Sequence, residues 1–269
     1  MTNTITPVFP LSMFDPVHLG VDENGEQVHV DLAERNMLLG GEPGAGKSNA
    51  LNLITAHAAL SADCKLILVD GKRVELDPWR KCADMFIGPS LPAATAAFQK
   101  FQAIMNSRYD ELVAAGRRKI TKGDGQPVYL VVIDEYAYFS ATVGSKRERE
   151  EFADLARDLV ARGRAAGVIV ILATQRPSHQ VIDPSLRDLF GYRWAFRCTT
   201  DSSSDIVLGQ GWAREGYNAA EIDPMARGVG WLLSESGVPR RIKAAYLSDD
   251  EIRHLSGYAA QLRAARQAA

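Results

Sequence analysis

The sequence predicts an α/β fold in which a mostly parallel central sheet is flanked by helices. From residue 37 onward, short apolar runs alternate with longer amphipathic segments, which is typical of βαβ units. The runs are continuous instead of alternating with polar residues, which indicates strands buried on both faces of a parallel sheet. A chain of 269 residues with 46% hydrophobic content is large enough to bury one substantial core.

Residues 1–34 are predicted to form an N-terminal extension with short strands, placed before a main domain at 35–269. The extension is rich in Pro, Asp and Gly. Val28, Val30 and Leu32 alternate with polar residues and predict one strand, and the preceding DENGEQ is typical of a hairpin turn. The first 16 residues have no charged start followed by an apolar run, so we do not expect a secretory signal.

The strands and helices of the main domain follow in order. Apolar runs predict strands at 37–40, 65–70, 128–134, 168–174 and 192–198. Amphipathic segments between these runs predict helices at 47–60, 93–116 and 147–167. Two further runs joined by a Gly-containing turn predict a C-terminal β-hairpin at 228–234 and 240–247. Ser248, followed by acidic residues, is typical of a helix N-terminus and predicts a closing helix.

A glycine-rich segment joins the first of these strands to the first helix. The segment GEPGAGKS, residues 41–48, matches GxxxxGK[ST] at every constrained position. Its glycines allow the backbone to wrap an anion, with the amides turned inward and a helix N-terminus behind them. We therefore predict an ATP site whose contacts come from Gly41, Glu42, Pro43, Gly44, Ala45, Gly46, Lys47, Ser48 and Asn49.

Lys47 and Ser48 have different tasks in a loop of this type. The lysine places a positive charge on the β- and γ-phosphates, and the serine hydroxyl is a ligand for Mg²⁺. Asp134 ends the strand 128–134 and is expected to hold the same ion, as Walker B acids do. Acids also end strands for reasons of turn geometry, but the presence of the phosphate-binding loop favours the metal role.

Two polar residues that follow buried strands are candidates for the hydrolytic step. Glu135 can orient and deprotonate the attacking water, which indicates a hydrolase; a solvated loop acid is the alternative. Gln175 can sense the γ-phosphate or the water, or it can be a polar strand cap. Arg162 and Arg164 end the helix 147–167. From the residues alone we favour interaction with the helix dipole over an arginine finger for both.

Composition leaves the partner open. The formal net charge is −2, within which a basic DNA-binding patch is easily hidden. The three cysteines lack metal-ligand spacing, so we expect reduced thiols in a cytoplasmic protein. No apolar stretch is long enough for direct membrane insertion, so recruitment to a membrane would need a membrane-bound transfer partner.

The motifs together resemble the FtsK/SpoIIIE family of DNA translocases. The resemblance runs from about residue 36 to 247. The segments that carry it are GEPGAGKS, ILVDGKRVEL, MNSRYDELVAAGRRKI, VVIDEYAYF and ARGRAAGVIVILATQRPSHQVI. The C-terminal part, with DPMARGVGWLL and PRRIKAAYL, is more similar to transfer proteins of actinobacterial conjugative plasmids and integrative elements.

The resemblance implies a RecA-like P-loop NTPase that assembles as a homo-hexameric ring around double-stranded DNA. It also implies that ATP binds between subunits, so that an arginine acts on the neighbour's nucleotide. Arg164 matches the family's helix-terminal arginine best, with Arg162 next. The segment 201–205 reads DSSSD, where chromosomal members carry a basic and an acidic residue. No sequence-reading winged helix or membrane anchor is recognised, so we do not expect sequence-directed loading.

Three functions are compatible with these residues. The first is an ATP-driven double-stranded DNA motor for conjugative transfer or DNA segregation. The second is a related secretion ATPase that moves polypeptide, although those usually carry tandem ATPase modules and this chain has a single P-loop. The third is a nucleotide switch or scaffold with little turnover, which the intact Lys47, Asp134, Glu135 and Gln175 disfavour.

Overall fold

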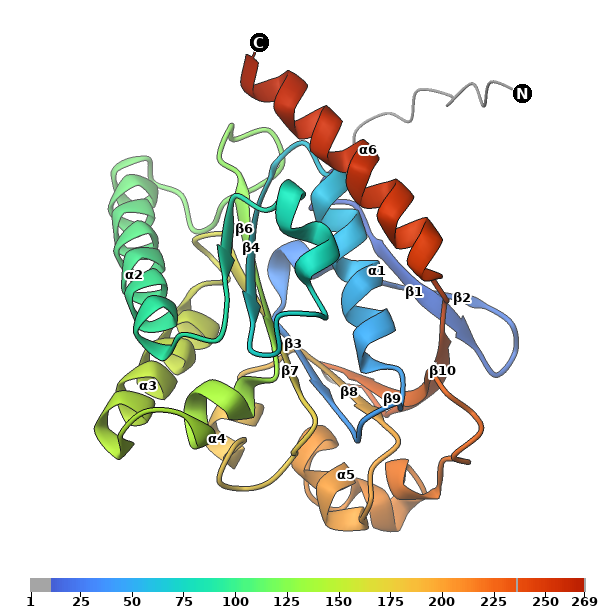
Figure 1. Cartoon of the computed structure of the whole chain (residues 1–269). Coiled ribbons are helices and arrows are strands. Elements are labelled where there is room, and N and C mark those ends of the chain that lie inside the picture. Colours follow the sequence, from blue (N-terminus) through green and yellow to red (C-terminus); the bar gives the residue numbers. More distant parts are fainter. Residues whose placement is uncertain (1–10, 236, 269) are drawn as a thin grey trace, which may run out of the picture.

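A single ten-stranded sheet organises the chain in a computed structural model that describes residues 11–235 and 237–268 (Figure 1). The first ten residues of the predicted extension lie outside the described residues. The strand order is β2-β1-β10-β9-β8-β3-β7-β6-β4-β5. Strands β8, β3, β7, β6, β4 and β5 run parallel, whereas β9, β10, β1 and β2 continue the sheet antiparallel.

The predicted α/β fold is confirmed, with its mostly parallel sheet, flanking helices, C-terminal hairpin and closing helix. The strands are β1 Val17–Asp22, β2 Gln27–Val30, β3 Met37–Gly40, β4 Cys64–Asp70, β5 Met85–Ile87, β6 Val128–Asp134, β7 Val168–Thr174, β8 Tyr192–Phe196, β9 Val229–Ser234 and β10 Arg240–Ala244. The α-helices are α1 Lys47–Leu60, α2 Leu91–Ala114, α3 Lys146–Arg162, α4 Pro184–Arg187, α5 Asp201–Leu208 and α6 Asp249–Ala268.

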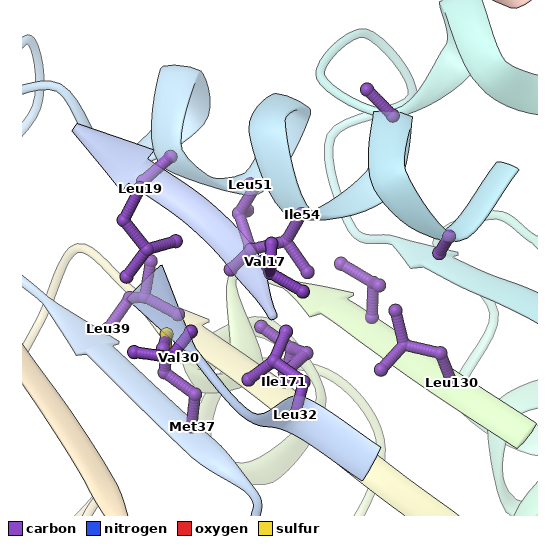
Figure 2. Packing of buried hydrophobic residues seen from close by; sticks show 14 of the residues in the cluster. Val17, Leu19, Val30, Leu32, Met37, Leu39, Leu51, Ile54, Leu130 and Ile171 are labelled. Atoms are coloured by element: carbon purple, nitrogen blue, oxygen red, sulfur yellow. The ribbon is translucent and has the colours of Figure 1, made fainter. Parts of the chain in front are cut away.

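The sheet is buried on both faces, as the continuous apolar runs predict. Along β6, Leu130 and Val132 belong to the core that includes α1 and α6, while Val131 and Ile133 belong to the core that includes α2 and α3. Figure 2 shows part of the first core, where Leu130 of β6 lies near the side chains of α1. Because successive side chains of a strand point to opposite faces of the sheet, β6 contributes apolar side chains to both cores.

The N-terminal segment adds strands to the same sheet. Strand β2 pairs with β1 across the expected hairpin turn, and β1, for which no bounds were predicted, pairs with β10. Val17 and Leu19 of β1 are buried and pack beside α1 in the first core (Figure 2). The segment thus forms the antiparallel edge of the sheet, and a domain boundary between residues 34 and 35 stays a prediction.

Helix α3 is shorter than predicted. It begins after a capping box made by Ser145 and Glu148, and it ends at Arg162 instead of continuing to residue 167. At Gly163 the chain turns back so tightly that a Cβ atom would lie 2.2 Å from the carbonyl oxygen of Val168. Amphipathic periodicity cannot detect this close approach, because it depends on the strand that follows. Helix α5, over the segment 201–208, was also missed.

Candidate nucleotide site

The carboxyl ends of four neighbouring parallel strands meet at one edge of the sheet. Strand β3 leads into the glycine-rich loop and α1, while β4, β6 and β7 end in Asp70, Asp134 and Thr174. This edge is where ligands bind in open parallel sheets, because the connecting loops converge there. The topology therefore places the predicted phosphate loop beside the predicted carboxylates.

Glycine is required at particular points of the phosphate loop. Gly44 and Gly46 have φ values of 77° and 113°, in the left-handed region that other residues adopt rarely. A Cβ atom on Gly46 would lie 2.6 Å from the Cα atom of Gly228. The loop is also fastened to that neighbour, because the Gly228 amide donates to the Ala45 carbonyl at 2.9 Å. The loop is thus a fixed cradle for an anion.

Lys47 is folded back onto the loop. It is buried, and its ammonium group donates to the carbonyl oxygens of Gly41 and Glu42, the latter at 2.8 Å. Burial lowers the pKa of Lys47 to about 8; Glu135 opposes this shift and Lys72 adds to it. The Lys47 ammonium group therefore lies beside the phosphate loop, where phosphate oxygens can replace the two carbonyl oxygens as its hydrogen-bond acceptors.

The other predicted loop residues differ in their surroundings. Ser48 occupies the first turn of α1, directly after Lys47. The side chain of Asn49 instead joins α1 to the chain after β10: it accepts from the Leu247 amide at 2.9 Å and donates to the Ala245 carbonyl. Its side chain is therefore occupied by a structural contact. Pro43 is exposed.

Glu42 forms an ion pair that the sequence did not predict. Its partner is Arg197, which follows β8, and the Arg197 carbonyl accepts the Glu42 amide at 2.9 Å. Thr199 also donates a hydroxyl hydrogen bond to Glu42 at 3.3 Å. These contacts connect the phosphate loop to the neighbouring strand.

Asp134 and Glu135 are buried at the end of β6. The Glu135 carboxylate accepts hydrogen bonds from the Thr174 hydroxyl at 3.0 Å and from the Gln175 amide at 3.2 Å. Its backbone has a φ of 59°, which is unusual outside glycine and turns the chain sharply after the strand. Strand β7 therefore holds Glu135 in place, and Gln175 contacts it through its main chain.

The surroundings of Asp134 suit a cation. Burial raises the pKa of its carboxyl to about 7, an effect that nearby Lys72 opposes and other acids reinforce. Its Oδ2 atom is buried and has no hydrogen-bond partner among the described residues. An orphaned carboxylate oxygen beside a phosphate cradle fits Mg²⁺, which is usually bound by one or two protein oxygens together with substrate phosphates. Ser48 and Asp134 are the residues that would hold it.

Arg164 lies near the amino-terminal end of β7, whereas the phosphate loop lies at the carboxyl ends of the parallel strands. It precedes β7, whose seven residues span about 20 Å at roughly 3.3 Å each. Its guanidinium is 3.7 Å from the carboxylate of Glu235, and both side chains are half exposed. Arg164 therefore does not reach the site of its own chain. Arg162, in contrast, pairs with Asp158 within α3.

Sequence reasoning missed two residues at the site edge, Asp70 and Lys72. Asp70 lies opposite Asp134 in the pairing of β4 with β6, and it is fully buried. The Lys72 ammonium lies 3.8 Å from Asp134 and 3.7 Å from Glu135. The sequence feature that could have identified them is an acidic residue at the end of a second buried strand, followed two residues later by a lysine.

The fold and this site define a P-loop ATPase domain. Residues 12–127 match the model of the FtsK/SpoIIIE family. A curated relative, the DNA translocase FtsK of Chlorobaculum tepidum, is 30% identical over 275 residues, which cover 93% of this chain and 32% of the relative. The DNA translocase FtsK of Staphylococcus aureus is 28% identical over 271 residues, with coverages of 93% and 33%. The resemblance to the FtsK/SpoIIIE family is thereby confirmed, and the chain spans about a third of these relatives.

Solved structures share the fold. The pCW3 conjugation coupling protein TcpA, in a monomer form with ATPγS, is 22% identical with a TM-score of 0.79; the match covers 96% of this chain and 73% of that one. The cytoplasmic domain of the Thermomonospora curvata type VII secretion ATPase EccC is 20% identical with a TM-score of 0.72, with coverages of 96% and 32%. Within residues 11–235 and 237–268, no helix is long and apolar enough to cross a membrane.

Proposed function

We propose that this chain is the motor domain of an ATP-driven double-stranded DNA translocase. The observation that carries the proposal is the placement of Glu135, a buried carboxylate fixed by β7 beside the phosphate loop and next to Asp134. A fixed general base at this position supports hydrolysis rather than nucleotide storage. The relatives named DNA translocase FtsK support DNA as the substrate.

Each residue of the site has a task in this proposal. Lys47 leaves the carbonyls of Gly41 and Glu42 for the β- and γ-phosphates, while the cradle amides bind the remaining phosphate oxygens. Ser48 and Asp134 would hold Mg²⁺, which would neutralise charge on the phosphates. Glu135 orients the attacking water and accepts its proton.

The residues after β7 link the site to the rest of the domain. Gln175 follows Thr174, and both bond to Glu135, so a shift of that carboxylate on hydrolysis would move the loop that leads to α4. In this proposal the Gln175 side chain senses the γ-phosphate. This coupling is the route by which we expect nucleotide state to reach a DNA-contacting surface.

We further propose that the active form is a homo-hexameric ring with ATP between subunits. Arg164 cannot serve its own site because about one strand length separates them. The Arg164 side chain is about half exposed, and in this proposal it reaches the nucleotide of an adjacent subunit. A finger of this kind stabilises transition-state charge and accelerates hydrolysis by roughly 10³-fold or more.

The biological setting that we propose is cytoplasmic DNA handling, in conjugative transfer or in segregation. The fold shared with a conjugation coupling protein agrees with the first setting. In either setting, a membrane-bound partner would supply any recruitment to the membrane.

The test is ATP turnover measured with linear double-stranded DNA, with single-stranded DNA and with an unfolded polypeptide. We expect stimulation by double-stranded DNA that weakens as salt rises, because binding rests on phosphate contacts. Stimulation by polypeptide alone would favour a secretion motor, a reading that the fold shared with EccC keeps open. Turnover that stays low with every polymer would indicate a nucleotide switch.

A further inference from the structure

The loop after β4 directs one lysine at the Asp134–Glu135 pair. The side chain of Asp70 accepts the backbone amides of Lys72 at 2.9 Å, Arg73 at 2.7 Å and Leu76 at 3.0 Å. The chain turns through Arg73, whose φ of 69° is in the left-handed region. A buried carboxylate with three amide hydrogen bonds fixes the loop conformation, so the fold sets the backbone position from which the Lys72 side chain extends.

The contacts that Lys72 makes are long for a buried ion pair. Its ammonium nitrogen is 3.8 Å from Oδ2 of Asp134 and 3.7 Å from Oε2 of Glu135, beyond the range of a good hydrogen bond. Both the ammonium nitrogen and Oδ2 of Asp134 are buried and lack a hydrogen-bond partner among the described residues. Buried charged groups in this condition are unfavourable, because no close partner compensates for their burial. Lys72 therefore offsets negative charge on the two carboxylates without forming a close hydrogen bond to either of them.

We propose that Lys72 is a placeholder cation for the magnesium subsite. In the nucleotide-free site it offsets part of the negative charge of Asp134 and Glu135, and it withdraws from Asp134 when Mg²⁺ arrives with the nucleotide. Lys72 therefore competes with the metal ion, and it raises the Mg²⁺ concentration needed for metal-dependent nucleotide binding. The proposal rests on the nucleotide site of the proposed function, but it does not depend on DNA or on hydrolysis.

Electrostatic repulsion and the exposure of the side chain both support displacement of Lys72 by Mg²⁺. An ammonium group and a divalent cation repel each other strongly at the separations found around Asp134. Mg²⁺ binds carboxylate oxygen at about 2.0–2.1 Å, so it would satisfy the orphaned Oδ2 where the lysine does not. The Lys72 side chain is 29% exposed, which gives it room to turn toward solvent once the ion is bound.

The experiment measures binding of a fluorescent, non-hydrolysable ATP analogue while free Mg²⁺ is varied. The variants are Lys72→Met, which keeps the apolar stem and removes the charge, and Lys72→Arg, which keeps the charge. Arg73→Gln is the matched control, since it removes a charge from the exposed neighbour in the same loop. We expect Lys72→Met to lower the half-saturating Mg²⁺ concentration at least about fivefold, the lower end of typical coupling between two bound groups. Lys72→Arg and Arg73→Gln should stay near the wild type.

Three outcomes overturn the placeholder role. Half-saturating Mg²⁺ that is unchanged or higher in Lys72→Met would mean that the lysine does not compete with the metal. Weaker nucleotide binding in Lys72→Met, equally with Mg²⁺ and with EDTA, would make Lys72 a phosphate contact. A wild-type protein that binds no nucleotide under any condition would remove the site itself, and the proposed function with it. Thermal unfolding of each variant identifies any that misfolds, in which case Lys72→Gln replaces Lys72→Met.

Discussion

Lys47 and Glu135 lie in one site, but replacing them should have different effects on ATP binding. Lys47→Ala removes the cation that meets the phosphates, so ATP binding should weaken and turnover should be lost. Glu135→Gln keeps the shape of the group and removes the base, so ATP should stay bound while turnover falls at least about 100-fold. Equilibrium binding of labelled ATP and a steady-state phosphate-release assay measure the two effects.

The amide in Glu135→Gln still has an oxygen to accept from Thr174 and Gln175, so this variant also controls for the fold. Hydrolysis near the wild-type rate in Glu135→Gln would remove the residue from the role of general base. Unchanged ATP affinity in Lys47→Ala would show that the stored ammonium group never reaches the phosphates.

Asp134 makes the stability of the nucleotide-free protein depend on pH. Its carboxyl has a pKa of about 7 in the folded chain against an ordinary 3.8, so the folded protein binds the proton more tightly than the unfolded chain. The stabilisation from that proton is complete below the unfolded value and is lost as pH rises toward 7. Between pH 5 and pH 8, the wild type should lose roughly 2–3 kcal/mol of unfolding free energy relative to Asp134→Asn.

Denaturant unfolding of both proteins in EDTA measures this difference. Lys47, whose pKa is lowered to about 8 by burial, acts in the opposite direction above about pH 8, so the range from pH 5 to pH 8 lies below most of its effect. A constant difference between wild type and Asp134→Asn across this range would show that Asp134 does not take up a proton on folding at these pH values, which contradicts the raised pKa.

At the scale of elements, Asn49 fastens α1 to the junction between β10 and α6. Its amide group bonds to the main chain on both sides of Tyr246. Asn49→Ala should destabilise the fold by about 1–3 kcal/mol, because two main-chain groups lose their partner. Asn49→Asp keeps the acceptor for Leu247 but sets a carboxylate oxygen against the Ala245 carbonyl, so it should also destabilise the fold.

Chemical denaturation gives the stabilities, and labelled ATP gives binding in the same samples. Loss of ATP binding in Asn49→Ala without any loss of stability would favour the direct nucleotide contact expected from the sequence. Loss of stability with ATP binding retained would assign Asn49 to the scaffold.

Local patterns predicted the regular elements well where the signal lies in neighbouring residues. Strand β6, strand β7 and helix α1 have the predicted bounds because continuous apolar runs and the phosphate-loop pattern define them. Pairings between distant segments were not predictable in this way. The contact of Glu42 with Arg197, and that of Lys72 with the carboxylates, form only after β8 or β4 takes its place in the sheet.

At the scale of the whole molecule, Arg164 should act between subunits. Arg164→Ala should keep nucleotide binding and the fold of the single chain, yet lose hydrolysis. Mixed with Lys47→Ala, it should regain part of the activity, since some interfaces then combine an intact phosphate loop with an intact arginine. Phosphate release from mixed and separate variants measures this recovery.

Assembly must be measured in the same mixtures, by light scattering with and without nucleotide. Arg162→Ala is the matched control, because Arg162 pairs with Asp158 inside α3 and should leave turnover largely intact. If the mixed proteins co-assemble and remain inactive, Arg164 loses its role as a finger across subunits.

Movement along double-stranded DNA is tested most directly by displacement of a third strand annealed to a linear duplex. A motor that travels on duplex DNA strips this strand as it passes, whereas a protein that only binds DNA leaves it in place. We predict release of the third strand that requires ATP and Mg²⁺ and is absent with Glu135→Gln. Retention of the third strand by a wild-type protein that binds the duplex and hydrolyses ATP on it would contradict DNA translocation.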